Sequence, residues 1–138
     1  MREIKSATGK TFLTITYDQE NNWIMNDWFG YVTVDNVMQG GLAFLEQLRS
    51  HNCCAGLNSN LNLVGPWDRS LPWIEEVWIP EAVKHGLRHY AMVVREESFS
   101  QESAEGMKAL VADRFNVEVF YDMDEARQWL RHYLMPAF

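Results

Sequence analysis

The five residues Tyr90–Val94 are all apolar and follow the polar His89. A continuous apolar run of this length is the pattern of a strand that is buried on both of its faces. Strands of that kind belong to parallel sheets against which helices pack. This segment therefore constrains the chain more than any other, and it predicts an α/β fold.

Two further segments alternate with the period of a strand. They are Thr11–Tyr17 and Trp23–Trp28, and the polar residues 18–22 between them favour a turn. These two strands predict an antiparallel hairpin near the N-terminus. Residues 1–10 carry no such period and are expected to form a loose N-terminal segment.

The rest of the chain alternates between strand and helix patterns. The expected elements are a first helix capped by Thr33, a strand at Ala55–Asn58, helices at Trp73–His85 and Gln101–Phe115, a strand at Val117–Tyr121, and a last helix capped by Asp122. Residues 1–138 are thus expected to form a single α/β domain. Its mixed sheet should have four to five strands, with the hairpin antiparallel and the later strands parallel, and about four helices.

Glycine and proline mark two of the predicted helices. Gly40 and Gly41 interrupt the first one, and Gly41, on its apolar face, would let that helix approach a sheet closely. Pro80 lies inside the second helix, where it must kink the helix or restart it.

Charge and cysteine content limit the kinds of partner and the cellular compartment to be expected. The formal net charge is −7, which argues against nucleic acid or an anionic membrane as a partner. No apolar run approaches the roughly 18 residues of a membrane span. Cys53 and Cys54 are adjacent, a spacing that suits free thiols in a reducing compartment. No secretory signal is visible, so a cytoplasmic location is expected.

Sequence motifs for catalysis or for a cofactor are missing. The chain has no phosphate-binding loop, no dinucleotide-binding fingerprint and no nucleophile elbow. His85 and His89 have a spacing found in metal sites, but Gly86 between them breaks the helix that this spacing requires. We therefore expect no catalytic residue, no metal and no cofactor, and we do not expect an enzyme.

Two groups of residues are candidates for a binding site. Residues 58–68 are expected to form a loop after a strand, and its polar side chains would line a polar mouth. Those side chains are Asn58, Ser59, Asn60 and Asp68. The alternative is that they are ordinary turn residues.

The second group is aromatic: Trp67, Trp73 and Trp78, together with Trp28. These side chains would form a pocket for an apolar or planar ligand. The alternatives are that they pack in the core or form half of a homodimer contact. Periodicity alone leaves these alternatives open.

Several segments also carry a resemblance to a family. They read GGLAFLEQL, LNSNLNLVGPW, LPWIEEVWIPEAVKHGLRHYAMV and DEARQWL. With the order of elements, they resemble small bacterial proteins of the SpoIIAA-like group (STAS, anti-sigma-factor antagonist) from Phe12 to Leu134. The resemblance implies a mixed sheet with helices and a role in binding rather than turnover. Relatives of that fold bind partner proteins, nucleotides or hydrophobic ligands.

The chain departs from the phosphorylated members of that group. They carry a D-S-[ST]-G run, whereas this chain has Asn58-Ser59-Asn60-Leu61 there and Ser70 further on. The resemblance therefore does not extend to a phosphorylation switch.

Three functions are compatible with these observations, in order of preference. The first is a non-enzymatic interaction or regulatory module that docks a protein partner or itself. The second is a carrier of a small hydrophobic ligand in a tryptophan-lined pocket. The third is a hydrolase-like enzyme that uses the loop at residues 58–68. The direction in which the tryptophans face distinguishes the first from the second.

Overall fold

The computed structural model describes residues 1–134, and these form a sheet of six strands in sequence order. The strands are β1 (Arg2–Lys5), β2 (Thr11–Asp18), β3 (Trp23–Gly30), β4 (Ala55–Leu63), β5 (His89–Val93) and β6 (Asn116–Phe120). Neighbours from β1 to β3 are antiparallel, and neighbours from β3 to β6 are parallel. The predicted α/β class, the hairpin and the parallel later strands are confirmed, with one strand more than the largest number expected.

The additional strand is β1, which lies within the segment expected to be loose. Its residue Ile4 is buried and pairs with Leu13 of β2, whereas the other three residues of β1 are exposed. The prediction for residues 1–10 is therefore wrong. A strand with one apolar side chain has no recognisable period. β1 is a strand because it pairs with β2. Its charged residues suit the open edge of a sheet, because they discourage further pairing.

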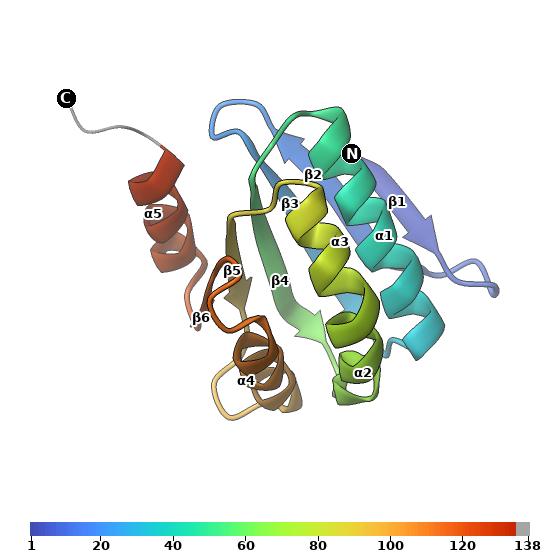
Figure 1. The fold of residues 1–138 in the computed structure, drawn as a ribbon. Helices are drawn as coiled ribbons and strands as arrows, with labels where there is room; N and C mark the ends of the chain where they lie inside the picture. The colour runs from blue at the N-terminus through green and yellow to red at the C-terminus, as the bar shows by residue number, and fades with distance from the viewer. Residues whose placement is uncertain (135–138) are drawn as a thin grey trace.

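Helices cover both faces of the sheet. They are α1 (Val34–Ser50), the 3-10 turn η1 (Asp68–Ser70), α2 (Leu71–Trp73), the π turn η2 (Ile74–Trp78), α3 (Ile79–Lys84), α4 (Phe99–Val111) and α5 (Met123–Leu134). From η1 to α3 the chain forms one helical stretch, residues 68–84, so the described residues hold four helical units, as predicted. This stretch, α1 and α4 pack on one face, and α5 packs on the other (Figure 1).

β5 contributes to both hydrophobic cores. Tyr90 and Met92 belong to the large core beneath α1, the helical stretch and α4. Ala91 and Val93 belong to the smaller core beneath α5. The structure thus confirms a strand buried on both faces, which the apolar run predicted.

The two glycines of α1 make different contacts. A Cβ placed on Gly40 would lie 2.7 Å from Leu13 Cδ2 and would also collide with the ring of Trp28, both in the sheet. A Cβ placed on Gly41 would instead lie 3.0 Å from Trp78 Cδ1 in the neighbouring helical stretch. The close approach of helix to sheet is therefore made by Gly40 and not by Gly41, which lets two helices approach each other.

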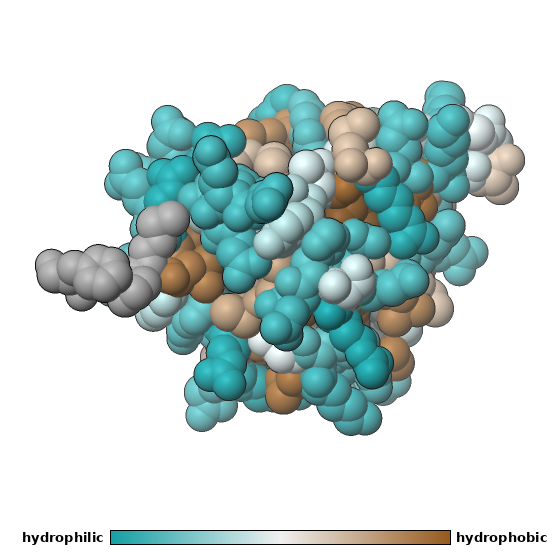
Figure 2. Space-filling view, turned by 90° about the horizontal axis from the view of Figure 1, so that it is seen from above, coloured by the Kyte–Doolittle hydropathy of each residue, from teal (hydrophilic) through white to brown (hydrophobic). Residues whose placement is uncertain are grey.

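The end of the molecule where the parallel strands begin has a mostly hydrophilic surface, with separate apolar patches (Figure 2). Within residues 1–134, no helix combines the length and the apolar character needed to cross a bilayer.

Candidate functional site

A cavity lies between the sheet and the helices of the three-helix face, and we call it the tryptophan pocket. Its walls are the aromatic side chains Trp28, Phe44, Trp67, Trp73, Trp78 and Tyr90, and its floor is formed by Asn26, Asn58 and Asn60. It offers about 50 Å³ to the centres of water-sized molecules. That is room for about four waters or a molecule of a few heavy atoms.

The tryptophans of the pocket face inward. Trp28 and Trp67 are each 8 % exposed and Trp78 is 4 % exposed. Trp73 is half-buried. Trp67 lies in the loop after β4, where its backbone N–H donates to Ser103 Oγ of α4 at 3.1 Å. Three of the indoles that line the pocket, those of Trp67, Trp73 and Trp78, therefore come from the segment between β4 and α3.

Pro80 explains how the helical stretch carries two of these indoles. A proline has no N–H, and in a regular α-helix its ring would clash with the carbonyl four residues earlier. Here the backbone widens into the π turn η2, where the Ile79 N–H donates to the carbonyl of Ile74, five residues back. The α-helix then restarts as α3, which is one of the two outcomes predicted for Pro80.

The π turn brings Trp73 and Trp78 to the same side of the helical stretch. In an α-helix with 3.6 residues per turn, residues five apart point about 140° away from each other. In a π turn, whose hydrogen bonds join residues five apart, such residues lie much closer to the same side. Both indoles accordingly reach Gly41, whose Cβ position lies 3.0 Å from Trp78 Cδ1 and 3.3 Å from Trp73 Cη2.

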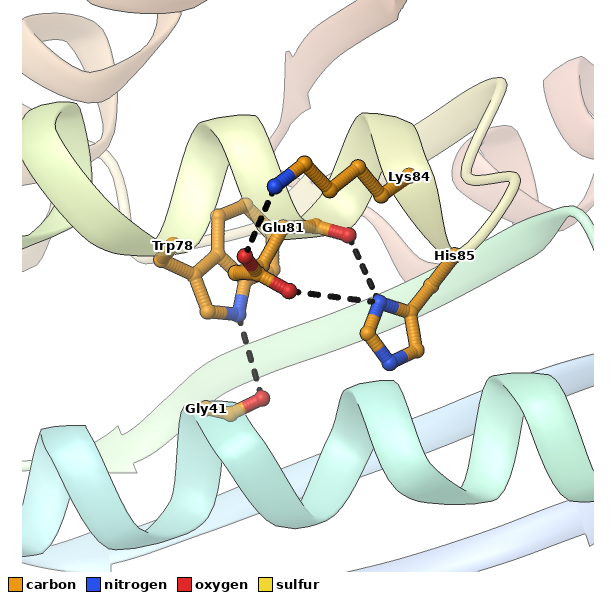
Figure 3. A network of polar contacts seen from close by, with 5 residues as sticks. All are labelled: Gly41, Trp78, Glu81, Lys84 and His85. Carbon is orange, nitrogen blue, oxygen red and sulfur yellow. Dashed lines mark hydrogen bonds and ion pairs between the residues drawn. The ribbon is translucent and has the colours of Figure 1, made fainter.

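Trp78 also ties the helical stretch to α1 by a hydrogen bond. Its indole Nε1 donates to the carbonyl oxygen of Gly41 at 3.1 Å (Figure 3). At the outer side of α3, Glu81 forms an ion pair with Lys84 near the surface, and its backbone oxygen lies 2.7 Å from His85 Nδ1. The position of this wall is thus fixed by a part-buried hydrogen bond, to which contacts near the surface add little.

The floor of the pocket is a row of three buried asparagines. Trp28 Nε1 donates to Asn58 Oδ1 at 2.8 Å, and Asn26 Nδ2 donates to the same oxygen at 3.4 Å. Asn58 Nδ2 donates to Asn60 Oδ1 at 3.3 Å. An indole N–H can only donate, so Trp28 fixes which end of the Asn58 amide is the oxygen. That orientation in turn fixes Asn26 and Asn60.

Three polar atoms of the pocket are buried without a hydrogen-bond partner. They are Asn26 Oδ1, Asn60 Nδ2 and Trp67 Nε1. Asn26 and Asn60 are 1 % and 2 % exposed. Leaving such a group unsatisfied costs about 1–3 kcal/mol. Three residues that line the pocket, Asn26, Asn60 and Trp67, therefore each hold one buried polar atom without a partner.

The pocket is electrically neutral. Among the described residues, none of the side chains that line it carries a charge. Burial raises the pKa of the Tyr90 phenol above its ordinary range, with the Asn26 side chain opposing the shift, so this phenol stays protonated. An ionic ligand would find no counter-charge there, and burying an unpaired charge is strongly unfavourable.

The structure brings together five of the seven site residues that the sequence predicted: Asn58, Asn60, Trp67, Trp73 and Trp78. The loop predicted at residues 58–68 is wrong in its first half, because β4 continues to Leu63 and pairs with β3 over that length. Asparagine is depleted in strands, so propensity ends the strand too early. Hydrogen bonds between the amides offset that preference.

Ser59 and Asp68 do not reach the pocket. Ser59 lies between Asn58 and Asn60 on β4, so its side chain points to the opposite face, where its oxygen accepts a hydrogen bond from Leu61 N at 3.4 Å. No hydrogen bond joins it to an imidazole or a carboxylate within residues 1–134. Asp68 is exposed at the start of η1.

Asn26 is a site residue that was not predicted from the sequence. It stands between Ile24 and Trp28 on the inward face of β3, so a polar residue occupies a position where the period demands an apolar one. That mismatch was a visible signal, because an uncharged polar residue at a core position needs a partner.

The cysteines and histidines form no second site. Cys53 and Cys54 are both free. Burial, with a smaller effect of Cys54, raises the pKa of Cys53 to about 11, so its thiol is protonated at neutral pH. In the part of the chain that the structure describes, no three residues of the metal-binding types lie close enough to hold an ion.

No protein-family model matches the chain, and a search of curated proteins gives no significant match. The function of the chain is therefore inferred from the geometry of the pocket.

Proposed function

We propose that this chain is a small-molecule-binding module, in which the tryptophan pocket holds a small, largely apolar ligand without turning it over. The observation that carries the proposal is an aromatic-walled cavity whose lining includes three residues, Asn26, Asn60 and Trp67, that each hold a buried polar atom without a partner. Ligand sites are mostly apolar with a few directed polar groups. A SpoIIAA-like relationship, suggested by the sequence, is consistent with a binding role and is part of this proposal.

The alternative of a purely structural core accounts less well for these residues. A core of this size gains nothing from three neighbouring asparagines, since apolar residues of similar volume would pack without unsatisfied groups. The inward orientation of Trp28, Trp67 and Trp78 likewise favours a pocket over a homodimer contact made by these side chains.

The test uses two matched substitutions on α1. Val37 lines the pocket, whereas Val34, one turn earlier, is 37 % exposed and does not. We expect saturation-transfer NMR to detect binding of compounds of a few heavy atoms, such as isopropanol and acetone, to the native protein and to Val34→Phe. Val37→Phe should abolish it by filling the cavity. If no such compound binds the native protein, or if Val37→Phe binds as well, the proposal is refuted.

Docking of a protein partner, including a second copy of the chain, is the second candidate. The observation in its favour is a group of exposed apolar side chains near the end of β4: Tyr31, Val64 and Phe99, which are 78 %, 55 % and 62 % exposed. Val64 and Phe99 line a common shallow hollow. Sedimentation equilibrium tests the second copy: association that Phe99→Ser removes supports it, and a monomer at all concentrations contradicts it.

A further inference from the structure

We propose that the Glu118 side chain closes the free edge of β6 to pairing with the β6 strand of a second copy of the chain. β6 is the last strand of the sheet, so one of its edges has no neighbouring strand among residues 1–134. A sheet edge with unpaired backbone groups is a template for pairing with another chain. The inference concerns this edge and does not depend on the tryptophan pocket.

The register with β5 determines which backbone groups of β6 point outward. Asn116 N donates to the carbonyl oxygen of Arg88 at 2.9 Å. In a parallel pair, alternate residues bond the neighbouring strand with both of their backbone groups. The even-numbered residues of β6 therefore bond β5. The N–H and C=O groups of Val117 and Val119 point away from β5, toward the free edge.

Glu118 occupies this edge at Val119. Its Oε1 accepts a hydrogen bond from Val119 N at 3.1 Å and another from Lys108 Nζ of α4 at 2.8 Å. Both side chains of the ion pair remain partly exposed, so the contact lies at the surface. Lys108 thus holds the carboxylate at the donor to which a backbone carbonyl of an added strand would bind.

Glu118 is the only charged residue of β6, whose sequence is NVEVF. Valine and phenylalanine are enriched in strands, so the rest of β6 favours pairing. The opposite edge of the sheet differs, because three of the four residues of β1 are charged: Arg2, Glu3 and Lys5. Charges on an edge strand discourage further pairing. β1 therefore has several such residues, whereas β6 depends on one.

A second copy that paired with β6 would meet both the hydrogen bond and the charge of Glu118. In a two-fold antiparallel pair, the backbone of Val117 would bond that of Val119 in the second copy. The two Glu118 side chains would then stand directly opposite each other. Like charges at opposite positions are destabilising. The pairing would also displace Glu118 Oε1 from Val119 N, so both effects oppose it.

The test replaces the carboxylate by side chains that strands favour. Glu118→Val removes the charge and the acceptor, and Glu118→Thr removes the charge and shortens the side chain without making it apolar. Sedimentation equilibrium at neutral pH should show that both variants self-associate about tenfold or more tightly than the native protein. The control is Glu76→Val, the same change at an exposed position of the helical stretch, which should sediment like the native protein.

Amide hydrogen exchange identifies the strand that pairs. In the native protein the Val119 N–H should exchange more slowly than the Val117 N–H, because Glu118 accepts a hydrogen bond from Val119 only. In the associated variants the Val117 N–H should become protected. Adding Phe99→Ser to Glu118→Val should leave the association intact, which distinguishes pairing of β6 from docking through the exposed apolar side chains near the end of β4.

Several outcomes would overturn the inference. One is that Glu118→Val and Glu118→Thr associate no more tightly than the native protein. Another is association that leaves the Val117 N–H unprotected, or that Phe99→Ser removes. If one variant does not fold, the other decides. If neither folds, the native protein decides, since equal exchange rates of the two amides would show that Glu118 does not hold the Val119 N–H.

Discussion

Gly40 and Gly106 stand in the interiors of α1 and α4 and form a matched pair for Gly→Ala substitution. Alanine is favoured over glycine in a helix by about 1 kcal/mol, so both changes share the same intrinsic gain. They differ in what the new methyl group meets. At Gly40 it would lie 2.7 Å from Leu13 Cδ2 and collide with the Trp28 ring, whereas at Gly106 the nearest atom is Leu71 Cδ1 at 3.1 Å.

The side chains around Gly40 cannot easily move to make room for a methyl group. Trp28 is buried, and its Nε1 is held by Asn58 Oδ1 at 2.8 Å. Overpacking costs typically about 1–3 kcal/mol, and the upper half of that range applies where the neighbour is fixed. After the helix gain of about 1 kcal/mol, Gly40→Ala should lower the free energy of unfolding by about 1–2 kcal/mol. Leu71 ends in a flexible methyl group, so Gly106→Ala should raise it by about 0.5–1 kcal/mol.

Urea unfolding followed by far-ultraviolet circular dichroism measures both changes, provided that the slope of the transition stays constant. The unfolding midpoint of Gly40→Ala should fall and that of Gly106→Ala should rise. A Gly40→Ala midpoint at or above that of the native protein would show that Trp28 moves aside at little cost. Close contact with the sheet would then not be what holds α1 in place.

Three further predictions concern other parts of the fold. Trp28→Phe should lower the free energy of unfolding by about 2 kcal/mol, since it removes a buried hydrogen bond and ring volume, as urea unfolding would measure. Removing the chain after Asp122 deletes α5 from its place over Trp23, and we expect an insoluble product or one without a cooperative thermal transition. Burial alone would raise the pKa of Glu118, but hydrogen bonds, chiefly from Lys108, lower it. The same hydrogen bond raises the pKa of Lys108, although burial opposes that rise. The pair therefore stabilises the fold at pH values between the ordinary pKa values of the two groups, by less than about 1 kcal/mol because both side chains are partly exposed. Glu118→Gln should slightly lower the free energy of unfolding at pH 7, and this difference should vanish at acidic pH.

Patterns with a strong local cause were predictable from the sequence. The apolar run Tyr90–Val94 gave β5, because a strand buried on both faces needs no alternation. Thr33 and Asp122 cap α1 and α5 through their side-chain oxygens, as expected from their residue types. In each case the residues that determine the element lie within a few positions of one another.

Features that depend on distant partners were not predictable in this way. β1 exists because β2 offers it an edge, and β4 extends past Asn58 because its amides meet Trp28 and Asn26 of another strand. The predicted site residues are divided for the same reason. Asn58 and Ser59 are neighbours in sequence, but their side chains lie on opposite faces of the sheet. Whether a polar residue belongs to a turn or to a buried network is a property of the fold around it.

The π turn of η2 makes the number of residues between Pro72 and Pro80 informative about evolution. A deletion of one residue between Trp73 and Trp78 would convert the π turn to a regular helical turn and leave the two tryptophans four apart, a spacing that keeps both indoles on one face of an α-helix. Pro80 would then lie inside a regular helix, where its ring clashes with the carbonyl four residues earlier. In an alignment of future homologues, a single gap in this segment should therefore occur together with the loss of Pro80.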